Sequence, residues 1–171
     1  MKKRILSILI MAVAASSYAA SPNGRCSMLL VSSPQKTNGS YASTFSATSV
    51  IDLDFSLLFT TSLSRKLPGA HVARIDVFTP KGNLYERMSV PFASSKSLNK
   101  ARVEGYRDLR DIVQLSSTSY KSKGYLRLKS TLPIAGTPVI TSSLYGNWSA
   151  VAYIDKDSAP CAATAQFTVS Q

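Results

Sequence analysis

The stretch from Trp148 to Ile154 constrains the fold most strongly, because its residues alternate between two chemically different faces. One face carries a large ring, two small residues and a branched residue, namely Trp148, Ala150, Ala152 and Ile154. This period of two predicts a β-strand, and the mixture of large and small residues suits a core closed by a second sheet. Gly146, two residues before Trp148, can adopt the positive φ that a reversing chain needs. The stretch therefore predicts a tight corner that leads into a buried strand.

Much of the remaining chain shows the same alternation in short segments. Between them lie turn residues such as Leu67-Pro68-Gly69 and Thr79-Pro80-Lys81-Gly82. Further strands are predicted over 27–32, within 43–60, and over 71–78, 84–91, 125–131, 137–141 and 163–169. We therefore predict about eight to ten short strands in one all-β domain. The segment 94–123 fits helix, strand or loop, since Gly105 weakens its helical stripe.

The residues of the predicted corner follow the order Leu144-x-Gly146-x-Trp148-x-Ala150. This order resembles the corner of immunoglobulin-like sandwiches, where an aromatic residue lies two positions before an inward residue on strand F. Trp148 stands where that pattern has tyrosine, and Ala150 stands where antibody domains have cysteine. The resemblance implies a single immunoglobulin-like antiparallel β-sandwich, of the kind seen in generic secreted bacterial modules. An ordinary antiparallel strand after a glycine turn would show the same residues.

The beginning of the chain has the composition of a secretory signal peptide. Met1-Lys2-Lys3-Arg4 precedes an apolar run over 5–15, and Ser17-Tyr18-Ala19 provides small residues for cleavage. The apolar run is shorter than the roughly 18 residues that cross a bilayer, which argues against an uncleaved anchor. We predict a signal peptide over 1–19 and a β-sandwich domain over 20–171, without an integral membrane segment after cleavage. The expected location is the periplasm or the extracellular medium.

The chain contains two cysteines, Cys26 and Cys161. In an exported protein such a pair most often forms one disulfide, whereas redox-active cysteines are usually close in sequence. Cys26 follows Asn-Gly-Arg, which is unlike a lipoprotein box, so no lipid anchor is expected. We predict a structural bridge that ties the start of the mature chain to the loop before the last strand.

The chain has an excess of basic residues. It carries 20 lysines and arginines against nine acidic residues, and removal of Lys2, Lys3 and Arg4 lowers the net charge from +11 to +8. Such a surface attracts polyanions, although the same charge also serves solubility. Tyr106, Tyr120 and Tyr125 lie among the charges and could stack on sugars or bases. The candidate anion-binding residues are Lys96, Lys100, Arg102, Arg107, Arg110, Lys121, Lys123, Arg127 and Lys129.

The sequence offers little catalytic chemistry. His71 is the only histidine, no Gly-x-Ser-x-Gly motif occurs, and both cysteines are assigned to the bridge. We therefore predict no enzyme, no catalytic residue, no metal site and no cofactor. Asp52 and Asp54 alternate with apolar residues and are interpreted as a solvated strand face, because a hard cation needs about six oxygen ligands. A small hydrolase with two carboxylates is a weaker alternative.

Export and fold class together favour an interaction module. We predict a non-catalytic secreted or periplasmic sandwich that acts in the envelope, in adhesion or in assembly, with an unknown protein as partner. The alternative partner is an anionic polymer or surface: an anionic glycan, a lipid headgroup or, less favoured, nucleic acid. Salt separates the two, because binding to a polyanion weakens steeply with salt, whereas a protein interface is apolar at its centre.

Overall fold

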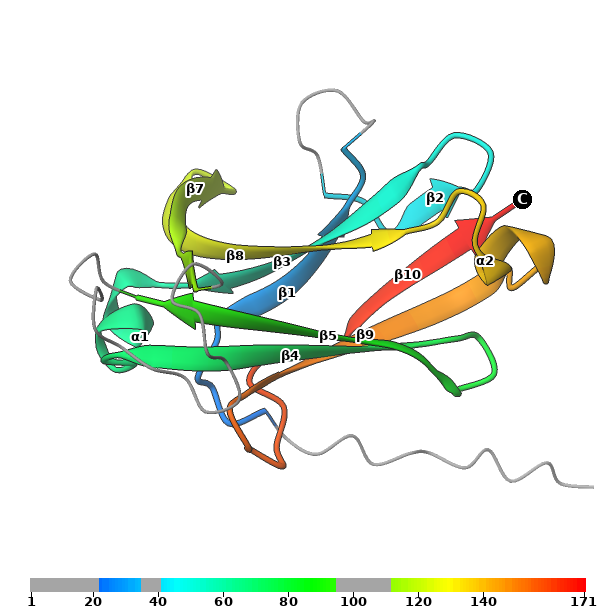
Figure 1. Cartoon of the computed structure of the whole chain (residues 1–171). Helices are drawn as coiled ribbons and strands as arrows, with labels where there is room; N and C mark the ends of the chain where they lie inside the picture. Colours follow the sequence, from blue (N-terminus) through cyan, green and yellow to red (C-terminus); the bar gives the residue numbers. More distant parts are fainter. Residues whose placement is uncertain (1–21, 35–40, 95–111) are drawn as a thin grey trace, which may run out of the picture.

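In the computed structural model, which describes residues 22–34, 41–94 and 112–171, two β-sheets pack face to face (Figure 1). The prediction of an all-β sandwich is therefore confirmed. Its immunoglobulin-like character remains a prediction. The signal peptide predicted over 1–19 lies outside the described residues.

One sheet has the strand order β1-β3-β8-β7, and the other has the order β2-β10-β9-β4-β5-β6. The strands are β1 (Met28–Ser32), β2 (Thr44–Ser46), β3 (Asp52–Phe59), β4 (Ala70–Phe78), β5 (Leu84–Ala93), β6 (Val113–Gln114), β7 (Ser116–Tyr120), β8 (Lys123–Pro133), β9 (Gly146–Ile154) and β10 (Ala165–Ser170). The described part also contains two short helices, α1 (Thr61–Arg65) and α2 (Pro138–Thr141). No helix in this part is long and apolar enough to cross a membrane.

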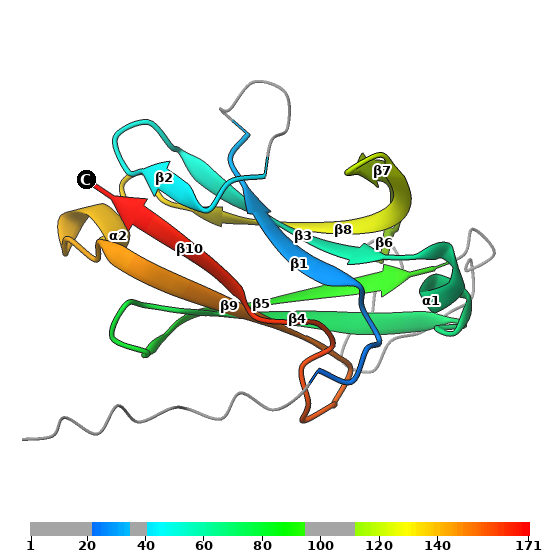
Figure 2. The ribbon, with the colours of Figure 1, turned by 180° about the vertical axis from the view of Figure 1, so that it is seen from behind.

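The chain changes sheets between its first two strands. β1 pairs antiparallel with β3 in the four-stranded sheet, whereas β2 pairs parallel with β10 in the six-stranded sheet. Figure 2 shows β1 and β10 starting near each other and separating along their length. This change of sheet sets the geometry of one lateral edge of the sandwich.

The predicted corner lies in the core as expected. Trp148 is 1% exposed, and its indole N–H donates to the Leu144 carbonyl at 3.0 Å. Its ring stacks on Phe167 of β10 with centroids 6.2 Å apart, and Phe167 in turn meets Phe55 of β3 edge-on at 5.7 Å. Gly146 has a φ of +129°. The aromatic contacts join the two sheets and pack against the core-facing side of β10.

The prediction of a strand over 137–141 is wrong, because this segment forms α2. The side chain of Thr137 accepts a hydrogen bond from the Val139 N–H at 3.3 Å, and Pro138 occupies the first turn. A capping threonine followed by proline favours a helix start and outweighs the strand preference of branched residues. Helix α1 was not predicted, although Thr60 caps it in the same way.

The interpretation of Asp52 and Asp54 as a solvated face is wrong for Asp54. This side chain is buried, accepts a hydrogen bond from Thr131 Oγ1 at 2.8 Å and pairs with Lys129 Nζ at 2.8 Å. Both partners lie on the neighbouring strand β8. Long side chains of β8 lie over β3, which a reading of β3 alone does not reveal.

Candidate functional site

The end of the sandwich around the two cysteines is closed. Cys26 and Cys161 form the predicted disulfide, with Cα atoms 5.0 Å apart. The Cys26 N–H donates to the Cys161 carbonyl at 3.1 Å, and the Asn23 N–H donates to the Pro160 carbonyl at 2.7 Å. The chain before β1 is thus tied to the chain before β10 by covalent and hydrogen bonds.

A charged cluster reinforces this closed end. Arg25 pairs with Asp157 at 2.7 Å and with Asp155 at 3.1 Å. Burial alone would lower the pKa of Arg25, but its hydrogen bonds to the two aspartates outweigh this effect and raise it. Burial alone would raise the pKa of Asp155, but hydrogen bonds from His71 and from the Val72 N–H, together with nearby positive charge, lower it.

The histidine in this cluster is engaged on both sides. His71 Nδ1 lies 2.9 Å from Asp155 Oδ2, and Nε2 lies 3.2 Å from the Pro68 carbonyl oxygen. Neither ring nitrogen contacts a hydroxyl or a thiol among the described residues, so the pair lacks the nucleophile of a catalytic triad. We interpret the cluster as a structural clamp on the loop after β9.

A second ion-pair group lies on the six-stranded sheet. Asp76 is buried and receives two hydrogen bonds from Arg87, at 2.8 and 3.0 Å, and these raise the pKa of Arg87. Arg74 lies over the ring of Tyr153, 4.2 Å from its centroid. A buried carboxylate held by a bidentate arginine is a structural pair. In the described part of the chain, no group of three or more His, Cys, Asp or Glu could hold a metal ion.

Only some of the candidate anion-binding residues can be placed. Five of them lie outside the described residues: Lys96, Lys100, Arg102, Arg107 and Arg110. The other four lie on the β7–β8 hairpin: Lys121 and Lys123 near its turn, Arg127 and Lys129 along β8. Lys129 is paired with Asp54, and Lys121 lies 5.3 Å from the ring centroid of Tyr120. The hairpin therefore gathers positive charge, part of which is neutralised within the fold.

The predicted tyrosines have separate environments. Tyr120 meets Tyr41 edge-on, with ring centroids 5.2 Å apart, and Tyr125 is half-buried on β8. Tyr106 lies outside the described residues. The Tyr120–Tyr41 contact brings the β7–β8 turn to the chain segment just before β2.

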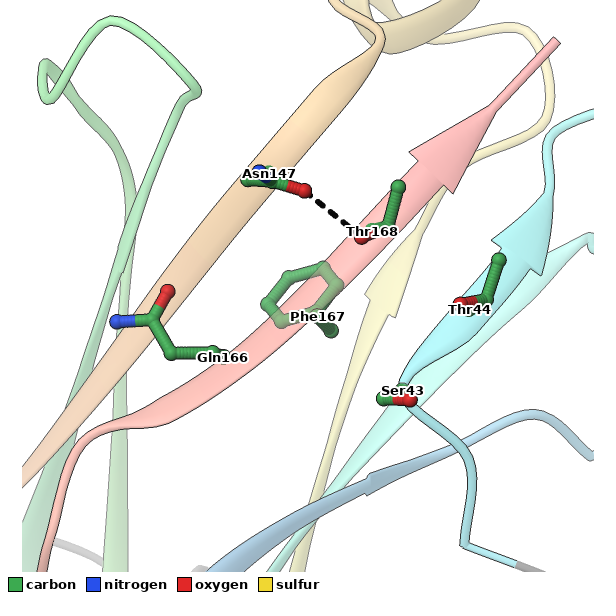
Figure 3. Close-up of a pocket in the computed structure, with 6 residues that line it drawn as sticks. All are labelled: Ser43, Thr44, Asn147, Gln166, Phe167 and Thr168. Carbon is green, nitrogen blue, oxygen red and sulfur yellow. Dashed lines mark hydrogen bonds between the residues drawn. The ribbon is translucent and has the colours of Figure 1, made fainter.

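Two adjoining hollows occupy the lateral edge where β1 separates from β10. The first, of about 370 Å³, is lined by Leu29, Leu30, Val31, Tyr41, Ala42, Ser43, Tyr120, Ala165 and Gln166. The second, also about 370 Å³, is lined by Ser43, Thr44, Asn147, Gln166, Phe167 and Thr168 (Figure 3). Because the two hollows share Ser43 and Gln166, we treat them as one feature, the lateral groove.

The lateral groove has an uncharged lining in a strongly basic chain. The hollow drawn in Figure 3 presents amide and hydroxyl groups, and Thr168 Oγ1 donates to Asn147 Oδ1 at 2.9 Å. The adjoining hollow presents mainly aliphatic and tyrosine side chains. Such a surface can offer hydrogen bonds and apolar contacts but no ion pairs.

Sequence reasoning missed the groove, although it assigned Gln166 and Thr168 to the side of the last strand opposite Phe167. That alternation was the available signal. The groove itself arises from the separation of β1 and β10, which are far apart in sequence. No protein-family model matches this chain, and a comparison with curated proteins found no match.

Proposed function

We propose that this protein is a non-catalytic, exported interaction module that binds a protein partner through the lateral groove. The observation that carries the proposal is an uncharged groove, part apolar and part hydrogen-bonding, on a chain of net charge +11. Protein interfaces combine such an apolar centre with a polar rim and are depleted of charge. The disulfide and the composition of residues 1–19 support a periplasmic or extracellular location.

The polyanion reading has weaker support. The basic side chains of the β7–β8 hairpin do not line the lateral groove, and Lys129 is already paired with Asp54. A polyanion site would need several unneutralised cations on one surface. The hairpin is therefore the second candidate surface, with Lys121 and Lys123 as its test residues.

The proposal is tested by capture from an envelope fraction of the source cells. Mature protein carrying Ser43→Glu places a charge in the groove, and the matched control Ser89→Glu places the same charge on β5, since both serines are exposed. We expect the wild type and the control to capture the same protein, and the groove variant to lose it.

Other results would contradict the proposal. Failure of the wild type to capture any protein counts against an interaction module. Capture that survives Ser43→Glu, but disappears with added salt and in a Lys121→Glu, Lys123→Glu variant, would favour the polyanion reading.

A further inference from the structure

The edge of β10 is only partly covered. The Thr168 N–H donates to the Ser43 carbonyl at 2.7 Å, on the side where β2 pairs over Thr168–Ser170. Backbone groups of residues two apart in a strand point the same way. The N–H and C=O of Gln166 therefore point toward the groove, and neither has a hydrogen-bond partner among the described residues.

The facing strand has the same property. The Ala42 N–H donates to the Val31 carbonyl at 3.2 Å, on the side of β1 away from β3. Leu29, two residues earlier, points its N–H and C=O the same way. β1 is an edge strand of its sheet, and Leu29 and Gln166 line the same hollow. Among residues 22–34, 41–94 and 112–171, no backbone partner is found for these groups of Leu29 and Gln166, which flank the groove on its two sides.

We infer that the lateral groove binds an extended, uncharged polypeptide segment of the partner, which adds as a short strand beside Leu29 and Gln166. This inference rests on the proposed function and specifies its partner. Strand addition to a free sheet edge is a general mode of peptide recognition, in which main-chain hydrogen bonds supply affinity.

The chain itself indicates this occupant. β2 is an extended segment that already pairs with the same edge of β10, directly beyond Gln166. An added strand would continue that pairing along the edge. The groove lining has no charged side chain, so a charged segment would lose hydration there without gaining an ion pair. The favoured segment is therefore neutral.

Two substitutions at one residue separate backbone pairing from side-chain recognition. Gln166→Pro removes the backbone N–H that faces the groove and leaves the β9 side of the ladder intact, and proline is tolerated at such edge positions. Gln166→Ala removes the exposed side chain and keeps the N–H. The pair is matched, because both variants lose the same side chain.

The probe is selected from phage-displayed random heptapeptides that lack Asp, Glu, Lys and Arg, panned on the mature wild-type protein. We expect the best peptide to bind the wild type and Gln166→Ala within about threefold of each other, and Gln166→Pro about tenfold more weakly, the value of one lost hydrogen bond. Thermal unfolding of each variant shows whether the fold is retained.

A second measurement needs no variant. Saturation of the wild type with this peptide should slow amide hydrogen exchange at Leu29 and Gln166 by about tenfold or more. The inference is overturned if no neutral peptide is enriched, or if these amides are not slowed. It is also overturned if a folded Gln166→Pro variant binds as well as the wild type. Loss of binding in Gln166→Ala alone would indicate side-chain recognition and equally overturn it.

These outcomes remain distinct from those of the proposed function. If Gln166→Pro captures the envelope protein as well as the wild type does, the interaction module stands and strand addition fails. If the wild type captures no envelope protein, the proposed function itself fails.

Discussion

The segment that leads through Cys26 into β1 and the segment that leads through Cys161 into β10 lie side by side at two places. They are joined at the disulfide and separated at the lateral groove. At the closed end, the disulfide Cys26–Cys161 and two backbone hydrogen bonds join them. A few residues later the two segments belong to different sheets, β1 to the four-stranded sheet and β10 to the six-stranded sheet. The lateral groove lies between Leu29 and Gln166. We expect the disulfide to limit how far β1 and β10 can move apart at the neighbouring groove. A binding edge that is held in place loses less entropy when it is occupied.

The largest expected effect comes from removing the support beneath β10. Trp148→Ala deletes a ring that is 1% exposed and stacks on Phe167, and we expect a loss of about 3–5 kcal/mol in the free energy of unfolding. Ser149→Ala, one residue along on the opposite face, should change it by less than about 0.5 kcal/mol. Urea unfolding measures both. If Trp148→Ala lowers the free energy of unfolding by less than about 1 kcal/mol, the corner does not belong to the core.

Opening the closed end is the next test. Replacing both Cys26 and Cys161 with serine should cost about 2–5 kcal/mol, because the bridge encloses a long loop. The oxidised wild type should be lighter than its reduced form by the mass of two hydrogen atoms. A thiol assay that finds free cysteines in protein purified without reductant would contradict the disulfide. If the disulfide limits the opening of the groove, the double variant should also bind the selected peptide more weakly. Unchanged peptide affinity would show that the disulfide does not affect the groove.

A smaller effect is expected at the far end of β10. Gly146 pairs with Val169 and has a φ of +129°, and an added Cβ would lie 3.2 Å from the Pro80 side chain. Gly146→Ala should therefore cost about 1–3 kcal/mol. Gly124→Ala is the control, since a Cβ there meets nothing within 4 Å and its φ is ordinary. Equal effects of the two substitutions in thermal unfolding would argue against strain at Gly146.

The smallest effect concerns charge, which the closed end uses and the groove lining lacks. The pKa of Asp155 is lowered in the folded protein, so its contribution to stability is present above the ordinary aspartate value of about 3.9 and disappears as the pH falls through the lower folded value. Asp155 is partly exposed, which keeps the effect small. The stability difference between the wild type and Asp155→Asn should shrink below about pH 4. A difference that is constant with pH would contradict this assignment.

Local patterns predicted those parts of the fold that depend on neighbours in sequence. Alternation alone located β9 and the β4–β5 hairpin, and the two cysteines alone indicated the bridge. The error at 137–141 arose because the Thr137 cap competes with the strand preference of its neighbours. The exposure of Asp54 was misjudged because its partners, Thr131 and Lys129, belong to another strand.

The candidate site depended on relations that no local pattern contains. Gln166 was correctly placed opposite Phe167, but whether its backbone is paired depends on where β2 begins. Leu29 lines the same hollow as Gln166 because β1 belongs to the four-stranded sheet, beside β3, and this pairing is not visible in the local sequence. Edges of sheets are properties of topology, so the groove could not be derived from the alternation of its own residues.

The disulfide also has a mechanical consequence. A pulling force applied upstream of Cys26 and downstream of Cys161 would pass from one cysteine directly to the other, and then along β10. The residues between the two cysteines, which are 135 positions apart, would carry none of this tension. Under such a load, the force would run along β10 and shear its hydrogen bonds to β9 and β2. The disulfide would therefore divert the force from the residues between the cysteines and concentrate it on β10.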